Sequence, residues 1–305
     1  MSSPSVLVIG AGELGTAVLD ALSKHAQRQS GRLAVLLRED TLKSADPAKA
    51  DRNEYLRSLG IELEAGDFIN TPIPALAAVF GRYDVVIQCG GYGIPTEVQV
   101  RVTEAVLEAG VPRYFPWQFG VDYDAIGPGN SEGLFDGMLG VRQLLRSQTK
   151  TKWTIISVGM FMSYLFLPSF GIVDLEERTV RALGSWENRV TVTTVEGIGT
   201  MTAEAVYRPD GTGSQVVHIA GDTMSYGKLA ELLDSSYGVT FKREVWDLPY
   251  LRQKLAERPE DLMAKYRVVF GSGTGISWDM EETLNHQRGI HLTGIREYIE
   301  ENRGP

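Results

Sequence analysis

The sequence is poor in cysteine, since Cys89 is the only one among 305 residues. A single cysteine excludes an intrachain disulfide and any zinc site built from several cysteines. Histidines do not compensate, because His286 and His291 have no third metal-ligating residue near them in the sequence, so no metal site is expected. A chain without disulfides is compatible with a reducing compartment, and we expect a cytoplasmic protein.

Basic residues are also in the minority. The chain has 30 Lys and Arg against 39 Asp and Glu, which gives a net charge of −9. Proteins that bind nucleic acids follow the phosphate backbone with clustered Lys and Arg, and this sequence contains no such cluster. We therefore expect no nucleic-acid partner.

Long hydrophobic runs are scarce. The opening MSSPSVLVIG has neither the basic residues nor the apolar core of a secretory signal. Only Trp153–Val173, WTIISVGMFMSYLFLPSFGIV, has the length of a membrane span without a charge. Its serines, its glycines, Pro168 and its β-rich start favour a buried strand followed by an apolar loop. No membrane partner is expected.

Linkers, repeats and low-complexity tracts are absent, and residues 1–160 instead alternate short apolar runs with amphipathic helical patterns. The expected strands are Val6–Ile9, Leu33–Leu37, Ile61–Ala65, Val85–Cys89, Tyr114–Phe115 and Thr154–Val158. The expected helices are near 13–26, 72–80, 96–109 and 134–148. This alternation is typical of parallel strands joined by crossover helices. It predicts an α/β fold with a Rossmann-type, doubly wound parallel sheet.

Beyond residue 160 the alternation becomes less regular. The pattern predicts a hairpin around LGSWENRVTVTT (183–194), a helix over 196–207 and a strand over 215–220. Further helices are expected near 225–236, 248–268 and 294–302. We interpret 161–305 as a smaller C-terminal lobe on the substrate side, packed on the first domain, with some elements returning to the sheet.

A glycine-rich loop follows the first expected strand. GAGELG places Gly10, Gly12 and Gly15 at the G-x-G-x-x-G spacing between a strand and a helix. The first glycine permits a tight turn, the second lets a pyrophosphate approach, and the third lets the helix lie close to the strand. With Glu13 and Leu14, these glycines form the expected dinucleotide-binding loop at a helix N-terminus.

The end of the second strand bears on which dinucleotide binds. LLRED places Arg38 where an acidic residue would hold the ribose of NAD, and arginine favours the 2′-phosphate of NADP(H). Lys43 is a possible second cation. Glu39 and Asp40 follow directly, so NAD and a merely solvated strand end stay open as alternatives.

Several segments together resemble the NmrA-like, isoflavone-reductase-like family of atypical short-chain dehydrogenases, with the fungal-type members most similar. They are the glycine loop with Arg38, IELEAGD (61–67), DVVIQCGG (84–91), EAGVPRYFPWQFGVD (108–122) and VTVTTVEGIG (190–199). The resemblance implies a Rossmann fold, NADP(H), and a reductase of secondary metabolism acting on an aromatic or phenolic small molecule. It also implies cofactor contacts from Gly90, Gly91, Gln118, Phe119, Met160 and Phe161.

The sequence departs from the family at its catalytic lysine. Family reductases carry Phe-x-x-Lys-x-x-Ile-Arg on the helix after the fifth strand; aligning Phe135, Val141 and Arg142 with this pattern places Met138 at the lysine. A thioether does not transfer protons. Gly137 and Gly140 flank Met138 despite the cost of glycine in a helix, which suggests room for a bulky apolar ligand. A helix that is simply packed is the alternative, because Met commonly fills gaps.

Other candidates lie after the fifth and sixth strands. Asp122 and Trp117 are expected in the substrate pocket, although Trp117 could equally be core. Tyr123 and Tyr164 are the candidate proton donors, with an aromatic wall as the alternative for each. Tyr250 and Lys254 form Y-x-x-x-K far downstream of the sheet, and we interpret them as an exposed helical pair.

Three functions remain open. The first is an NADPH-dependent oxidoreductase that reduces C=N or C=C in an aromatic or heterocyclic substrate, such as an iminium that needs no proton. The second is a cyclase that uses the cofactor-bound pocket with little net redox. The third is an NADP-sensing regulator without turnover. The protein is expected to be a monomer or homodimer.

Overall fold

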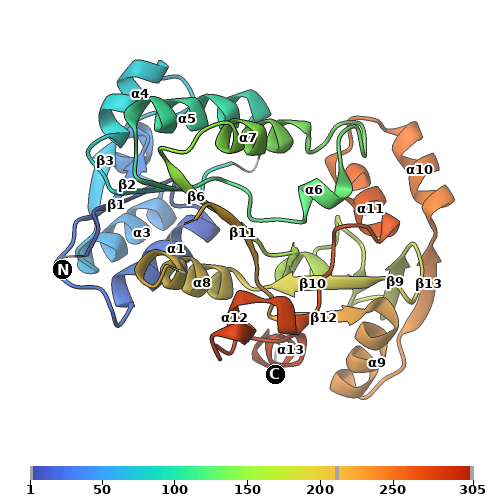
Figure 1. Ribbon diagram of the computed structural model, residues 1–305. Coiled ribbons are helices and arrows are strands. Elements are labelled where there is room, and N and C mark those ends of the chain that lie inside the picture. Colours follow the sequence, from blue (N-terminus) through green and yellow to red (C-terminus); the bar gives the residue numbers. More distant parts are fainter. Residues whose placement is uncertain (1–2, 92, 210–212, 303–305) are drawn as a thin grey trace. The chain divides into compact units, whose positions relative to one another are not determined.

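The structure is a computed structural model that describes residues 3–91, 93–209 and 213–302, so the first two residues of the opening stretch lie outside it (Figure 1). The chain forms two compact units. The first unit comprises Met1–Gln118, Gly137–Ile156 and Ile198–Val217, and the second comprises Phe119–Asp136, Ser157–Gly197 and His218–Pro305. Each unit is therefore assembled from separate stretches of the chain.

A seven-stranded sheet forms the centre of the first unit. Its strand order is β11-β6-β5-β4-β1-β2-β3. The strands are β1 (Val6–Ile9), β2 (Leu33–Leu37), β3 (Glu62–Ala65), β4 (Val85–Gln88), β5 (Arg113–Phe115), β6 (Lys152–Ser157) and β11 (Gln215–His218). The pairs from β3 across to β6 are parallel, with Val6 of β1 aligned to Leu33 on one side and to Val85 on the other. The order reverses between β1 and β4, as in a doubly wound sheet.

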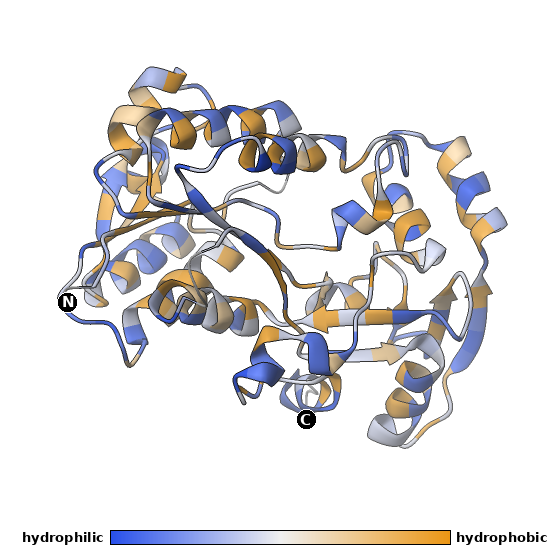
Figure 2. Cartoon of the chain, viewed as in Figure 1, coloured by the Kyte–Doolittle hydropathy of each residue, from blue (hydrophilic) through white to orange (hydrophobic). Residues whose placement is uncertain are grey.

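Helices cover both faces of this sheet (Figure 1). One face carries α1 (Glu13–Lys24), α3 (Pro47–Ser58) and α8 (Val195–Tyr207), and the other carries α4 (Ile73–Phe80), α5 (Thr96–Ala109) and α7 (Asp136–Arg146). A short helix, α2 (Glu39–Leu42), follows β2. Strands β1, β2 and β4 are buried throughout, as expected for strands covered on both faces. Hydrophobic and hydrophilic residues alternate along the helix ribbons, as one-sided packing requires (Figure 2).

Helix α3 was not predicted from the sequence. Its residues PAKADRNEYLRS include only Asn53 and Leu56 as buried positions, so the helix has almost no apolar stripe to detect. Its start is nevertheless well defined, because Asp46 accepts a hydrogen bond from the Lys49 amide at 3.2 Å and Pro47 occupies the first helical position. Capping therefore indicates this helix where hydrophobic periodicity does not.

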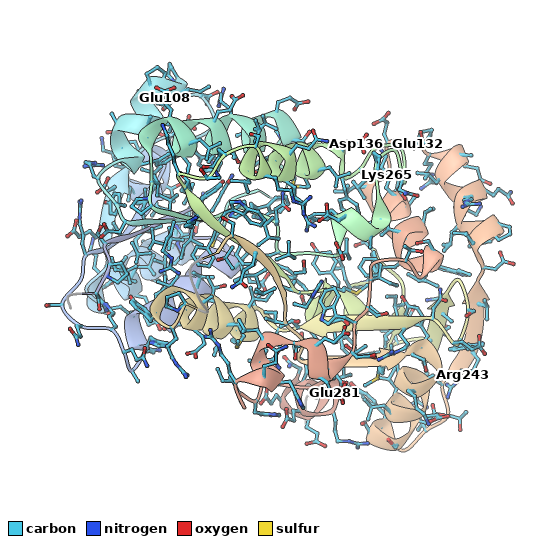
Figure 3. All side chains as sticks on the ribbon, in the orientation of Figure 1. Glu108, Glu132, Asp136, Arg243, Lys265 and Glu281 are labelled. Atoms are coloured by element: carbon cyan, nitrogen blue, oxygen red, sulfur yellow. The ribbon has the colours of Figure 1, made fainter. Side chains whose placement is uncertain are left out.

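The second unit contains two small sheets. One has the order β12-β10-β7 and the other β13-β9-β8. The strands are β7 (Met160–Phe161), β8 (Val173–Asp174), β9 (Thr179–Leu183), β10 (Arg189–Thr193), β12 (Asp222–Ser225) and β13 (Lys242–Trp246). The helices are α6 (Tyr123–Ile126), α9 (Tyr226–Tyr237), α10 (Leu248–Glu257), α11 (Leu262–Ser272), α12 (Leu284–Gln287) and α13 (Ile295–Asn302). Arg243 of β13, labelled in Figure 3, forms an ion pair with Asp234 of α9 at 2.7 Å.

Two of the expected elements in this unit are wrong. The hairpin over 183–194 does not form, because β9 and β10 belong to different sheets; Asn188 donates its side-chain amide to the carbonyls of Leu183 and Gly271, which fixes the intervening loop. The single helix over 248–268 is two helices. Pro259 forces Arg258 out of helical geometry (φ −143°, ψ 75°), and Asp261 then caps α11.

The apolar segment Trp153–Val173 divides into short elements, as its serines, glycines and proline suggested. It contributes most of β6, then β7, then a 3₁₀ helix over Met162–Phe166. Within the described residues, none of the helices combines the length and the hydropathy that crossing a bilayer requires.

Candidate functional site

The glycine loop lies where β1 and β4 end side by side. Gly10 adopts φ +88°, a left-handed conformation that favours glycine, and its amide donates to the Leu36 carbonyl at 3.1 Å. A Cβ atom on Gly10 would lie 3.2 Å from Cα of Gly90, in the loop after β4. The two loops therefore touch at the switch point of the sheet, where doubly wound folds bind ligands.

The other two glycines of the loop differ in their surroundings. A Cβ atom on Gly15 would lie 2.2 Å from the Gly10 carbonyl oxygen, so this glycine is needed for the close approach of α1 to the loop. A Cβ atom on Gly12 would meet nothing within 4 Å. Gly12 is the N-cap of α1, with no side-chain cap, and Glu13 and Leu14 begin the helix. The open space thus lies at an uncapped helix start, where backbone N–H groups attract anions.

Arg38 lies at the end of β2, exposed, as the N-cap of α2. Arg38 is close enough to Asp67, in the loop after β3, to act on its carboxyl. Burial raises the pKa of the Asp67 carboxyl, but hydrogen bonds from Asn70 and Ile69 and the charge of Arg38 together hold this pKa below its usual range. Lys43, the other expected cation, forms an exposed ion pair with Glu39 of the same short helix. Arg38 is therefore the freer of the two cations.

Arg52 of α3 also reaches the glycine loop, and sequence reasoning missed it together with its helix. Its guanidinium donates to the Ala11 carbonyl, between Gly10 and Gly12, at 2.9 Å. The neighbouring Asn53 accepts from the same guanidinium at 3.2 Å. The cap at Asp46 is the sequence signal that could have placed this residue on a helix following Arg38.

Aromatic rings pack on the two glycines after β4. A Cβ atom on Gly91 would lie 2.0 Å from the indole of Trp117, and one on Gly90 would lie 3.0 Å from the ring of Phe68. Trp117 is half-buried, so one part of its ring packs on backbone and the remainder stays accessible. Both glycines of DVVIQCGG thus have a packing reason as well as the expected role in cofactor contact.

Gln118 links β5 to α7 within the same unit. Its side-chain amide donates to the Met138 carbonyl at 2.8 Å, and its side-chain oxygen accepts from Nε of the fully buried Arg142, also at 2.8 Å. Gln118 itself is 1% exposed. Both ends of its side chain therefore hold α7, and Met138, 4% exposed, lies buried on that helix.

One of the two glycines beside Met138 has a packing explanation that differs from the one expected. A Cβ atom on Gly137 would lie 2.3 Å from Cβ of Thr96 on α5, so the space beside Gly137 is filled by protein and is not available to a ligand. Around Gly140 only Val100 comes near, at 3.9 Å, which is ordinary contact. Close packing of α5 on α7 accounts for Gly137 and not for Gly140.

The remaining predicted site residues belong to the second unit. They are Phe119, Asp122, Tyr123, Met160, Phe161 and Tyr164. Tyr123 is 5% exposed, with its ring 4.7 Å from that of Phe135. Tyr164 is half-buried and contacts Phe161 and Phe170 edge-on at 6.3 and 6.1 Å between ring centres. Phe119 and Met160 are buried. Of the two tyrosines, Tyr164 is the more accessible.

Asp122 has a neighbour that the sequence did not suggest. One carboxylate oxygen accepts the backbone amides of Asp124 and Ala125, capping α6, and the other lies 3.9 Å from Nε2 of His218. The imidazole of His218 packs on the indole of Trp278, with ring centres 4.5 Å apart. His218 and Asp122 are far apart in the sequence, so no local pattern indicated this pairing.

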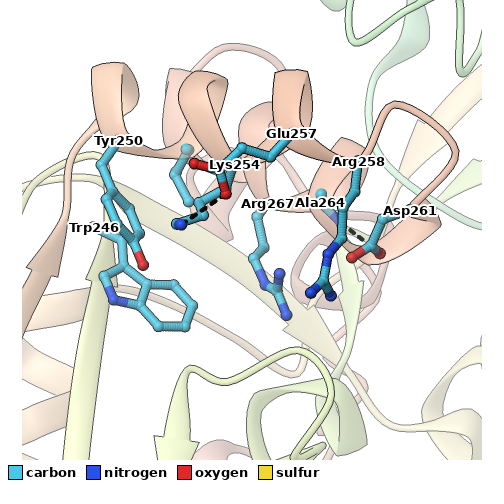
Figure 4. Close-up of a pocket in the computed structure, with 9 residues that line it drawn as sticks. Trp246, Tyr250, Lys254, Glu257, Arg258, Asp261, Ala264 and Arg267 are labelled. Atoms are coloured by element: carbon cyan, nitrogen blue, oxygen red, sulfur yellow. Dashed lines mark hydrogen bonds and ion pairs between the residues drawn. The ribbon is translucent and has the colours of Figure 1, made fainter.

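A pocket of about 210 Å³ lies between β13, α10 and α11 (Figure 4). It contains the Tyr250 and Lys254 pair, on α10 as expected, with the ammonium 5.7 Å from the ring centre. Lys254 is also ion-paired with Glu257 at 2.8 Å, and Asp261 caps α11. Because these charges are already satisfied by neighbours, the pair has the character of a surface helix contact.

Comparison with known proteins shows similarity to one family along nearly the whole chain. A sequence model of the NmrA-like family matches residues 2–299. A relative from Gibberella moniliformis, described as an NmrA-like family domain-containing oxidoreductase, is 48% identical over 301 residues, 98% of each chain. The match thus extends over nearly the whole chain.

Solved structures agree with the fold. Isoflavone reductase superimposes with a TM-score of 0.80 at 21% identity, over 98% of this chain and 99% of that one. A binary complex of leucoanthocyanidin reductase with NADPH from Vitis vinifera also gives a TM-score of 0.80, at 19% identity, over 97% and 98%. The Rossmann-type α/β fold expected from the sequence is confirmed.

Proposed function

The chain belongs to the NmrA-like family, and on this premise we propose that it is an NADP(H)-dependent oxidoreductase of secondary metabolism. The proposed substrate is an aromatic or heterocyclic small molecule in which C=N or C=C is reduced. The relative from Gibberella moniliformis is described as an oxidoreductase, and the similar leucoanthocyanidin reductase was solved with NADPH. Both descriptions support the reaction class.

The observation that carries the proposal is the geometry of the glycine loop. Gly10 and Gly15 are held closely by packing, whereas the space beside Gly12 is open at the uncapped start of α1. Such a cradle fits a pyrophosphate, since a Cβ at Gly12 would stand in that space. Arg38 is exposed at the end of β2, where a 2′-phosphate would be bound. The residues present therefore fit NADP(H).

When bound, NADPH would supply a hydride to the electrophilic carbon of the substrate. The chain would orient the cofactor through Gly12, Glu13 and Leu14, with Gly90 and Gly91 beside them. Met138 stands at the position of the family's lysine and offers no proton. An iminium carbon needs none, because hydride addition alone gives the neutral amine, and this is the substrate class that best suits the loss of the lysine.

A C=C substrate would require one proton in addition to the hydride. Tyr123, Tyr164 and solvent are the proposed donors. Tyr164 is the more accessible tyrosine, so Tyr164→Phe is the more informative substitution. For an iminium substrate this change should leave turnover intact, whereas for an enone it should slow turnover if Tyr164 is the donor.

Calorimetric titration with NADPH, NADP⁺, NADH and NAD⁺ is the first test. Tight binding of the phosphorylated pair, with weaker binding of the other two, would support the cofactor assignment. Absence of binding by all four would overturn the proposal. Consumption of NADPH is then followed with cyclic imines and aromatic enones, and product is identified by mass spectrometry.

The binding and turnover measurements also distinguish the two alternative functions, a cyclase and an NADP-sensing regulator. Product formed without net consumption of NADPH would indicate a cyclase. Binding that differs between NADPH and NADP⁺, with no turnover and with a protein partner that follows the cofactor's redox state, would indicate a regulator. Either result would replace the reductase proposal.

A further inference from the structure

Arg52 holds an unusual position for a charged side chain. It extends from α3 to the glycine loop, where its guanidinium donates to the Ala11 carbonyl at 2.9 Å. A second N–H bonds the side chain of Asn53, at 3.2 Å. Nε is buried and makes no hydrogen bond within the described residues. Since a guanidinium has five N–H donors, most of its capacity is unused at this point of the loop.

The charge of Arg52 lacks a close counterion. No carboxylate in residues 3–91, 93–209 or 213–302 lies within 4.0 Å of its guanidinium. Burial lowers the pKa of this group, opposed by the charge of Asp46, but that carboxylate caps α3 instead. The hydrogen bond to the Ala11 carbonyl does not explain the positive charge, because a neutral donor could make the same bond. A partly buried cation without a counterion is costly unless an anion arrives to pair with it.

Hydrogen bonds connect Arg52 to the segment that carries Arg38. Asn53, which accepts from Arg52, donates to the Thr41 carbonyl at 3.1 Å, and the Thr41 amide donates to the Arg38 carbonyl at 2.9 Å. The helix of Arg52 is therefore held against the turn that follows β2. In contrast, Lys43 of the same turn directs its charge to Glu39.

We propose that Arg52 is, with Arg38, a cationic ligand of the 2′-phosphate of NADP(H) and that it determines the preference for the phosphorylated cofactor. The inference rests on the proposed function and extends it to a residue outside the glycine motif. The guanidinium contacts the loop that would hold the pyrophosphate, and the neighbouring Asn53 is hydrogen-bonded to the turn after the strand end that would hold the ribose. Arginine suits this place because its planar N–H groups match phosphate oxygens in pairs.

The test compares affinities for ligands with and without the phosphate. Calorimetry measures NADPH, NADH, 2′,5′-ADP and 5′-ADP against wild type, Arg52→Gln and Arg52→Lys. Glutamine retains a donor for the Ala11 carbonyl but removes the charge. We expect Arg52→Gln to weaken NADPH and 2′,5′-ADP about 10- to 100-fold, as for loss of a charge-assisted hydrogen bond, and NADH and 5′-ADP less than about 2-fold. Arg52→Lys should retain most of the preference.

Arg57→Gln is the matched control, because Arg57 is an exposed residue of the same helix and its loss changes the net charge equally. It should leave all four affinities unchanged. Equal weakening of NADPH and NADH in Arg52→Gln would show that Arg52 only braces the loop, and would overturn the inference; so would an unchanged ratio of the two affinities. Wild-type protein that binds neither dinucleotide would defeat the proposed function itself, which is a distinguishable outcome.

Discussion

Gly137 on α7 and Thr96 on α5 approach so closely that a Cβ atom on the glycine would lie 2.3 Å from Cβ of the threonine. Real Cβ atoms do not come this near, so one of the two positions must lack a side chain. Gly140, one turn along α7, has no such neighbour. Close packing therefore explains Gly137 but not Gly140, and substitution should distinguish the two positions.

Gly137→Ala should destabilise the protein and Gly140→Ala should stabilise it. Overpacking against Thr96 is expected to cost about 1–3 kcal/mol. At Gly140 alanine meets ordinary contact, so the gain in helix propensity should appear, up to about 1 kcal/mol. Denaturant unfolding measures both. Adding Thr96→Gly to Gly137→Ala should recover part of the loss; if it does not, the contact between these helices is not the reason for the glycine.

Gly12→Ala should weaken dinucleotide binding while leaving the fold nearly unchanged. The new methyl group meets no protein atom within 4 Å, and loss of a glycine N-cap costs about 1 kcal/mol or less. It would, however, occupy the space proposed for the pyrophosphate, so NADPH affinity should fall at least about 10-fold. Gly213→Ala, also in open space, is the control. Unchanged NADPH affinity in Gly12→Ala would contradict the loop assignment.

Gln118→Leu should destabilise the protein by about 2–4 kcal/mol, because the substitution removes both the acceptor for buried Arg142 and the donor to the Met138 carbonyl. Thermal or denaturant unfolding measures the loss. Gln143→Leu, at an exposed position of the same helix, should change stability by no more than about 0.5 kcal/mol. Similar losses in the two variants would show that the buried link contributes nothing specific.

Stability should depend on pH through Asp234. Its hydrogen bond to Arg243, opposed by burial and aided by the Phe241 amide, holds the pKa of this carboxyl below its ordinary 3.8. A lowered folded-state pKa means that the stabilisation is present above the unfolded value and is lost as pH falls through the folded one. Arg243→Gln should therefore flatten the acid limb of the stability curve below about pH 4. Lys228→Gln, on the same helix with an exposed partner, should not.

Much of the sheet could be predicted because its strands are buried on both faces and contain continuous apolar runs, as in VLVI and LAVLL. Helix α3 could not be predicted from hydrophobic periodicity, because its residues are almost all polar or exposed. The prediction of a hairpin over 183–194 was wrong although the alternating pattern correctly indicated strands. Which strand pairs with which is decided by tertiary contacts, and β9 and β10 belong to different sheets. A single helix was predicted over 248–268 because the residues before and after Pro259 both have helical patterns, and the break at this proline was therefore overlooked.

The candidate site divides in the same way. Gly10, Gly12, Gly15 and Arg38 could be placed from local spacing alone, because a strand, a tight turn and a helix start are consecutive in the sequence. Arg52 and His218 could not, since their contacts with Ala11 and Asp122 join residues far apart in the chain. The space beside Gly137 was misinterpreted because a sequence does not reveal which helix lies opposite.

The order of segments has a consequence for synthesis on the ribosome. The seven-stranded sheet ends with β11, whose last residue is 218 of 305, and β6 pairs with it. Until β11 has left the exit tunnel, β6 presents an unpaired edge, which can pair with other chains. We therefore expect nascent chains ending before residue 215 to depend on chaperones, and truncated proteins ending there to aggregate.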